Sequence, residues 1–249
     1  MDYRITDAVA DLPGSESYHS EKLLRIAPCF LCYSPPANAP EIVVLPAKKN
    51  SYITFGCFNT WAKINKETLG WWAELLAAIP DSQLMMKNAA MFCPQVQQQC
   101  LKFFEGKGIA NNRLQLICPV VATSDHLAYY NKIDIALDSY PYHGTTTSCE
   151  ALYMGVPVLT LAGDLHMSRV GVSLLTTLGL QDWIALDSED YIQKAMTFAG
   201  DLAGLNAVRQ HLRQQMLASP LCDGEGFSKK LAAVYRQCWV DYADGFRDN

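Results

Sequence analysis

Segments with the pattern of buried strands alternate with segments that have a helical pattern through most of the chain, from about residue 50 to residue 190. Strands are predicted at 52–58, 82–87, 113–119, 134–138, 156–161 and 182–187. Helices are predicted at 65–80, 93–108, 123–131, 146–154 and 168–179. One-to-one alternation implies successive βαβ units. The sequence therefore predicts an α/β fold with a Rossmann-like parallel sheet and helices on both faces.

Prolines separate the start of the chain from this alternating region. Residues 34–48 carry four prolines, which is typical of a linker. We expect an N-terminal segment and linker (1–48), a Rossmann-like domain (49–220) and a C-terminal helix directed back toward the N-terminal side (221–249). That last helix carries an aromatic stripe over 226–244. The stripe either packs on this domain or reaches across to a second one.

Charge and hydropathy restrict the partners that the chain can have. The net charge is −5, and the lysines and arginines are scattered rather than clustered. This pattern gives no electrostatic support for a nucleic-acid or anionic-membrane partner, and we expect neither. No apolar run approaches the ~20 residues of a membrane-spanning helix, and acidic residues stand where a signal peptide would be basic. We expect a soluble protein in the cytoplasm.

The nine cysteines are an odd number, and most lie within apolar runs. In a cytosolic chain such cysteines are expected to be buried, reduced thiols. The only C-x-x-C, Cys29 to Cys32, has no second pair and no histidine at zinc spacing. We predict that it lies on a strand and that the chain holds no metal.

The stretch that follows the predicted strand 134–138 has the residues of a phosphate site. Gly144 precedes three threonines, Thr145, Thr146 and Thr147, at the start of a predicted helix. A helix N-terminus offers unpaired N–H groups and partial positive charge, and glycine lets the backbone approach a ligand closely. The threonine hydroxyls add further donors. The alternative, that Thr145 or Thr146 only caps the helix, remains open from this stretch alone.

Three further polar residues lie where the loops of such a sheet would bring them to the same edge. Glu150, one turn into the same helix, can accept hydrogen bonds from a vicinal diol such as ribose. Lys63, in the loop after strand 52–58, can reach a pyrophosphate. His126, near the start of helix 123–131, can stack on a base or hydrogen-bond to it. Each residue also has an alternative without a ligand. Glu150 can be a carboxylate that the helix dipole favours in the first turn, Lys63 a solvated loop lysine and His126 an exposed surface histidine.

A dinucleotide dehydrogenase is the less favoured reading of the same fold. The loop after strand 52–58 has no G-x-G-x-x-G, and the glycine-threonine turn comes at the fourth strand instead. A nucleotide-sugar epimerase is suggested by fold analogy only.

Several separated motifs, in one order, resemble a known family. They are "YRITDAVADLPGSESYHSEKLLRI", "FGCFNTWAKINKETLGWWAELLAAIPDSQL", "NRLQLICPV", "DIALDSYPYHGTTTSCEALYMGVPVLTLAGDLHMSRVGVSLLTTLGL" and "SPLCDGEGFSKKLAAVYRQCWVDY". Together they cover nearly the whole chain. They resemble the C-terminal half of the catalytic region of the O-linked N-acetylglucosamine transferases, the SPINDLY-like glycosyltransferases that are often found behind tetratricopeptide repeats.

The resemblance implies the two-domain GT-B architecture, with this chain as the C-terminal half that binds the donor, UDP-N-acetylglucosamine. It implies that Lys63 contacts the diphosphate as the catalytic group that neutralises the leaving UDP, with Thr60 as a polar phosphate contact. By the same resemblance Thr146 and Thr147 hold the β-phosphate, with Thr145 at the same helix start. Glu150 would bind the ribose diol and His126 would lie against the uracil.

The implied reaction is metal-free, inverting transfer of the sugar to a serine or threonine hydroxyl of an acceptor protein, with no cofactor. Some family members carry a histidine where Thr145 stands and a lysine where Thr123 stands. The chain also has no counterpart of the family's N-terminal catalytic domain or repeats, so we expect it to be incomplete alone. The sugar (N-acetylglucosamine, glucose or fucose) and the alternative of a nucleotide-sugar-binding module without catalysis remain open.

Overall fold

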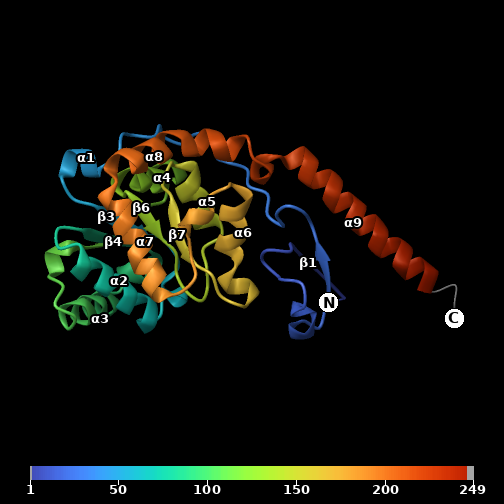
Figure 1. Cartoon of the computed structure of the whole chain (residues 1–249), viewed down its shortest axis with the longest axis horizontal. Helices are drawn as coiled ribbons and strands as arrows, with labels where there is room; N and C mark the ends of the chain where they lie inside the picture. Colours follow the sequence, from blue (N-terminus) through green and yellow to red (C-terminus); the bar gives the residue numbers. More distant parts are fainter. Residues whose placement is uncertain (1, 246–249) are drawn as a thin grey trace.

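A parallel sheet of six strands forms the centre of the computed structural model, which describes residues 2–245 (Figure 1). Its strand order is β5-β4-β3-β6-β7-β8, and every neighbouring pair is parallel. The strands are β3 (Thr54–Cys57), β4 (Gln83–Lys87), β5 (Leu114–Ile117), β6 (Ile135–Leu137), β7 (Val158–Leu161) and β8 (Ile184–Ala185). The predicted α/β fold with a parallel sheet is confirmed.

The strand order reverses direction between β3 and β6. From β3 the chain moves outward through β4 and β5, then returns to place β6 on the other side of β3. In open α/β sheets such a reversal leaves a crevice between the two loops that leave the carboxyl ends of the central strands. Here those loops are 58–65, after β3, and 138–145, after β6, and a small pocket between them is lined by Asn59, Asp138 and Thr147, among others.

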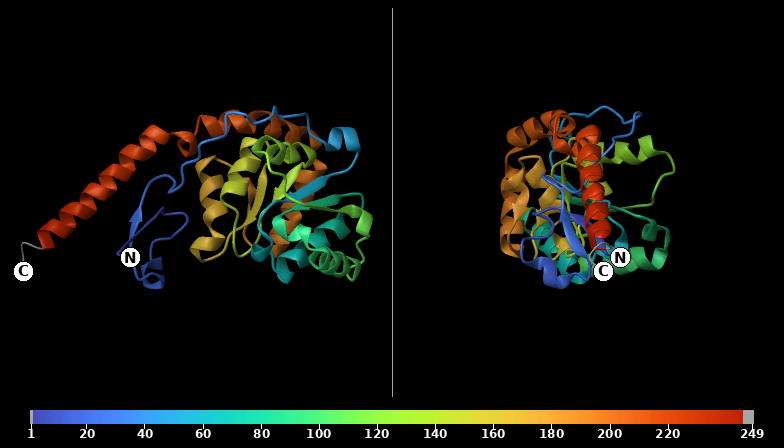
Figure 2. Two further views of the ribbon diagram at one scale, coloured as in Figure 1. Left: turned by 180° about the vertical axis from the view of Figure 1, so that it is seen from behind. Right: turned by 90° about the vertical axis from the view of Figure 1, so that its right-hand side faces the viewer.

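Helices cover both faces of the sheet (Figures 1 and 2). The helices of residues 2–245 are α1 (Ala47–Asn50), α2 (Lys66–Ala78), α3 (Pro94–Glu105), α4 (Thr123–Ala128), α5 (Thr146–Tyr153), α6 (Val170–Thr177), α7 (Ser188–Gly200), α8 (Leu202–Leu217) and α9 (Gly224–Gly245), of which α9 extends past the sheet. α2 packs against α7, and α5 packs against α8. Because both faces are covered, every residue of β3 and of β7 is buried.

Local signals explain where these helices begin and end. The Asn65 side chain accepts a hydrogen bond of 2.8 Å from Thr68 N and so caps the start of α2. Gly155 follows α5 with φ +74°, a conformation that favours glycine and ends the helix.

The N-terminal segment forms a separate pair of parallel strands, β1 (Tyr3–Thr6) and β2 (Lys22–Arg25). It lies beside α6, at the carboxyl edge of the main sheet (Figures 1 and 2). Ser173 of α6 donates a hydrogen bond of 2.6 Å to Asp7, and the Arg169 guanidinium donates one of 2.7 Å to Val9 O. These bonds attach the segment to the sheet domain.

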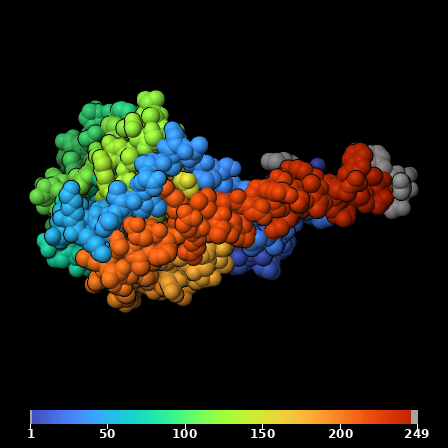
Figure 3. Space-filling view, turned by 90° about the horizontal axis from the view of Figure 1, so that it is seen from above, coloured from blue at the N-terminus to red at the C-terminus, as the bar shows by residue number. Residues whose placement is uncertain are grey.

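The C-terminal helix α9 extends past the sheet domain and runs over the N-terminal segment (Figure 3). Lys22 Nζ lies 3.2 Å from Asp241 Oδ2, and Lys230 Nζ donates to Ala27 O at 2.9 Å. Tyr235 and Trp239 of the predicted aromatic stripe remain 58% and 65% exposed, so this part of the stripe does not pack on the sheet domain. Within residues 2–245 no helix combines the length and the apolar character needed to cross a bilayer.

The predicted strand at the C-x-x-C is wrong. Residues 27–33 have no strand, and the adjacent strand β2 ends earlier, at Arg25. The N–H groups of this stretch bond elsewhere than to a neighbouring strand: Phe30 N donates to the Asp7 carboxylate at 2.9 Å, and Tyr33 N donates to Leu221 O at 2.7 Å. Cys29 is buried, with Sγ 3.3 Å from Ser173 Oγ, whereas Cys32 is exposed. Burial raises the pKa of Cys29, as expected of an unreactive thiol.

Candidate functional site

The crevice between β3 and β6 brings Lys63 onto the threonine turn. Lys63 ends a short 3-10 turn, Trp61–Lys63, and its Nζ donates a hydrogen bond of 2.8 Å to His143 O. The same ammonium lies 4.1 Å from the centroid of the Tyr142 ring. Burial lowers the pKa of Lys63, and the negative charge of Asp138 partly offsets this effect. The Lys63 ammonium, from the loop after β3, is therefore held against the loop after β6.

Asp138, at the end of β6, organises the loop that leads to α5. The residue is only 4% exposed, and its Oδ1 accepts hydrogen bonds from Ser139 N at 2.9 Å and from Gly144 N at 2.7 Å. The Asn59 amide donates to the same oxygen at 3.1 Å, and the Thr160 hydroxyl donates to Oδ2 at 3.0 Å. The buried carboxylate thus fixes the turn that aims the start of α5 into the crevice. The only sequence signal for this role was an aspartate ending an apolar strand.

The start of α5 has no side-chain cap. Thr145 occupies the N-cap position, but its side chain makes no capping hydrogen bond, so the capping alternative is wrong for this residue. Thr146 is exposed, and the Thr147 hydroxyl donates to Asn59 Oδ1. A Cβ on Gly144 would lie 2.7 Å from both Asn59 Oδ1 and Thr147 Oγ1, so only glycine fits. The N–H groups of the first turn remain for a ligand.

His126 and Glu150 also lie together, on the side of the crevice toward β4. His126 Nε2 lies 2.9 Å from Glu150 Oε2, and the Tyr130 hydroxyl donates to the same oxygen at 3.2 Å. His126 Nδ1 is bonded to Lys87 Nζ. Because an ammonium can only donate, Nδ1 accepts and Nε2–H donates to Glu150. With both ring nitrogens engaged, His126 offers a ligand the face of its ring.

Lys87 is a site residue that the sequence reasoning missed. It ends the buried strand β4, is 3% exposed and lies 5.4 Å and 5.3 Å from the ring centroids of Phe58 and Tyr129. Burial lowers the pKa of Lys87, while the charge of Glu150 acts in the opposite direction. A lysine directly after the apolar run of a strand was the available signal, since a buried lysine needs partners.

Thr60 lies at the rim of the crevice. It is exposed at the N-cap position of the Trp61–Lys63 turn and makes no side-chain capping bond there. The structure therefore brings Lys63 to the threonine turn and His126 to Glu150, and it leaves Thr60 at the rim. Across residues 2–245 no group of histidine, cysteine, aspartate or glutamate side chains is arranged to hold a metal ion.

Solved structures with the same fold define the class of protein. The chain superposes on a mutant of the Thermobaculum terrenum O-GlcNAc transferase with a TM-score of 0.91 and 37% identity, over 97% of this chain and 45% of that chain. A sucrose-phosphate synthase from Thermosynechococcus elongatus, at 16% identity and a TM-score of 0.63, shares the fold over 96% of this chain and 59% of that one. The chain is a Rossmann-like domain of the GT-B glycosyltransferase type.

Residues 41–231 match the family model described as glycosyl transferase family 41, and the chain belongs to that family. It is 42% identical to a tomato (Solanum lycopersicum) protein named as a probable UDP-N-acetylglucosamine–peptide N-acetylglucosaminyltransferase SPINDLY, over 98% of this chain and 26% of that protein. The Arabidopsis thaliana protein of the same name is 41% identical, with 27% of its length covered. The chain spans about a quarter of the length of these curated relatives.

Proposed function

We propose that the chain is the donor-binding region of an inverting glycosyltransferase that transfers N-acetylglucosamine from UDP-N-acetylglucosamine to serine or threonine hydroxyls of proteins. The observation that carries the proposal is the uncapped start of α5 opposite Lys63, at the reversal point of the sheet. A helix N-terminus and an ammonium group facing one crevice suit a diphosphate. The nucleotide, the sugar and the peptide acceptor of the proposal are those that appear in the names of the relatives.

Each candidate residue has a role in this proposal. The diphosphate lies between Lys63 and the first turn of α5, where Thr145, Thr146 and Thr147 supply N–H or hydroxyl donors. Glu150 binds the ribose diol through Oε1, because its known bonds both go to Oε2. The uracil lies on the ring face of His126. Thr60 contacts the phosphates from the rim.

In the reaction the acceptor hydroxyl oxygen attacks the anomeric carbon from the face opposite the diphosphate. The bond from that carbon to the β-phosphate oxygen breaks, and the configuration inverts. The hydroxyl proton passes to a base on the N-terminal catalytic portion, which we propose as a partner of this chain. Lys63 and the start of α5 stabilise the charge that develops on the departing UDP; removing one such donor costs on the order of 10²–10³ in rate. No metal is needed in this scheme.

The second candidate is a nucleotide-sugar-binding module without catalysis, because every candidate residue of the site has a role toward the donor and none toward the acceptor hydroxyl. A UDP-release assay with radiolabelled donor and mixed acceptor peptides separates the two. We expect transfer when an N-terminal catalytic half from a relative is added to the chain. Donor binding without transfer in that mixture would leave only the binding module. We also propose a cytoplasmic location, which the nine free thiols support.

A further inference from the structure

A pocket of about 290 Å³ lies at the same edge of the sheet as the crevice, between the N-terminal segment and the loop after β7. The N-terminal segment contributes Arg4, Asp11, Ser15 and His19 to its lining, among others. The loops after β6 and β7 contribute Tyr142 and His166. None of these residues except Tyr142 has a place in the site described above.

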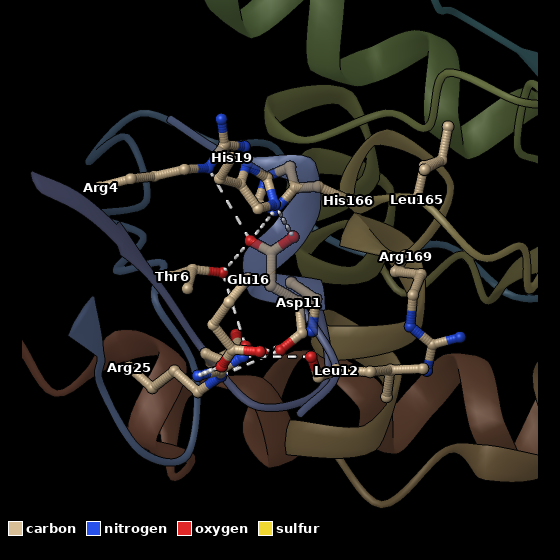
Figure 4. A network of polar contacts seen from close by, with 12 residues as sticks. Arg4, Thr6, Asp11, Leu12, Glu16, His19, Arg25, Leu165, His166 and Arg169 are labelled. Atoms are coloured by element: carbon tan, nitrogen blue, oxygen red, sulfur yellow. Dashed lines mark hydrogen bonds and ion pairs between the residues drawn. The ribbon is translucent and has the colours of Figure 1, made fainter. Parts of the chain in front are cut away.

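One buried carboxylate orients two imidazoles in this pocket. Asp11 is 2% exposed; its Oδ2 lies 2.8 Å from His166 Nδ1, and its Oδ1 lies 3.2 Å from His19 Nε2 (Figure 4). The Thr6 hydroxyl donates to Oδ2 at 2.6 Å. Burial acts to raise the pKa of Asp11, but the hydrogen bond from Thr6 and the interactions with His166 and His19 outweigh it, and the pKa is lowered. The carboxylate thus fixes both rings, and the second nitrogen of each ring is left for a ligand.

Two further donors in the lining have no hydrogen-bond partner among the described residues. Ser15 is 8% exposed, and its hydroxyl is unpaired. Arg4 Nε is also unpaired; the nearest carboxylate oxygen, Asp11 Oδ2, lies 3.8 Å away. Buried polar groups without partners cost about 1–3 kcal/mol each. A ligand with several oxygens would satisfy both groups.

The charges of the lining favour a neutral ligand over a second anion. Arg4 is the one lysine or arginine among the described residues of the lining, and with the two imidazoles neutral it is outnumbered by two carboxylates, Asp11 and Asp164. The exposed ring of Tyr142 adds an apolar surface on which the C–H groups of a sugar ring can pack. Hydrogen-bonding groups around an apolar surface suit a neutral polyhydroxyl compound.

The position of the pocket continues the path of the donor. The proposed nucleoside contacts, His126 and Glu150, lie toward β4, and the diphosphate seat follows at the start of α5. The next strand in the same direction is β7, whose loop carries His166. Tyr142 joins the two places, because it lines the pocket and its ring lies 4.1 Å from Lys63 Nζ.

We propose that this pocket receives the sugar of the nucleotide-sugar donor, with Ser15, His19 and His166 as hydrogen-bonding contacts and Asp11 as the positioning residue. The inference rests on the proposed function. It assigns recognition of the sugar in part to the segment that precedes the sheet domain.

The test compares UDP with UDP-N-acetylglucosamine in calorimetric titrations of the 249-residue chain. The measured quantity is the ratio of the two dissociation constants. We expect Ser15→Ala and His166→Phe each to weaken UDP-N-acetylglucosamine binding at least ~5-fold, the loss of about one hydrogen bond, and to leave UDP binding unchanged. His211→Phe, on the exposed side of α8, is the matched control and should leave the ratio unchanged.

Three outcomes are distinguishable. Wild-type dissociation constants for both compounds in both variants would overturn the sugar pocket while the diphosphate seat stands. An equal loss for UDP and for the nucleotide sugar would also overturn it, since the pocket would then hold a phosphate. If the unmodified chain binds neither compound, the proposed function itself fails.

Discussion

Replacing Lys63 by methionine is the most direct test of the diphosphate seat, because methionine keeps much of the apolar stem and removes the charge. An ammonium about 4 Å from a phosphate charge, at an effective dielectric constant of ~20, contributes about 4 kcal/mol. Without ligand the same ammonium donates to His143 O at 2.8 Å and lies 4.1 Å from the Tyr142 ring. Giving up these contacts costs about 2 kcal/mol. The net loss in Lys63→Met is about 2 kcal/mol, or roughly 30-fold in the dissociation constant of UDP.

Calorimetric titration with UDP measures this loss, and Lys66→Met is the control. Lys66 begins α2 three residues later and is exposed. The Lys66→Met variant should therefore bind UDP with the affinity of the unmodified chain. Wild-type affinity in Lys63→Met, or an equal loss in Lys66→Met, would refute the reasoning. In the first case the phosphates do not meet this ammonium; in the second, only the overall charge matters.

The same reasoning predicts a pH dependence. Because burial lowers the pKa of Lys63, the ammonium deprotonates at a lower pH than an ordinary lysine. UDP affinity should therefore be full below that pKa and should fall as the pH rises through it, on the alkaline side where the diphosphate is fully ionised. Lys63→Met should lack this step. An identical alkaline fall in the variant would assign the titration to another group.

Two further changes test how the site and the fold are held. Gly144→Ala should weaken UDP binding about 10-fold, since its Cβ would lie 2.7 Å from Thr147 Oγ1; Gly70→Ala, with open space around its Cβ, should not. Arg209→Met should lower the free energy of unfolding in urea by about 3 kcal/mol or more, because the buried guanidinium donates to Val43 O at 2.9 Å and to Ile133 O at 2.9 Å. The exposed Arg236→Met should change it by less than about 0.5 kcal/mol. A loss of UDP affinity in Gly70→Ala, or equal stability of the two arginine variants, would contradict these expectations.

The candidate site could be predicted from the sequence only where a charged or hydroxyl side chain stands next to a predicted strand end or helix start. Lys63, Glu150 and the three threonines could be proposed because each lies in the loop after a predicted strand or in the first turns of a predicted helix. Lys87 was missed because a lysine at a strand end reads as solvated until its burial is known. Asp138 was missed because two of its four hydrogen-bond donors, Asn59 and Thr160, come from other strands and loops that lie far from it in the sequence.

The sequence by itself determined the strands of the main sheet, the helices that connect them and their order, because strand and helix periodicities are local and the buried strands of a parallel sheet are apolar throughout. It also determined the family, through motifs spread over the chain. Only the tertiary structure decided that β6 lies beside β3, which opens the crevice and sets Lys63 on the threonine turn. Only it joined Asp11 to His166, 155 residues apart. Such contacts depend on how the strands pair and how the segments pack in space, and no local pattern in the chain records either.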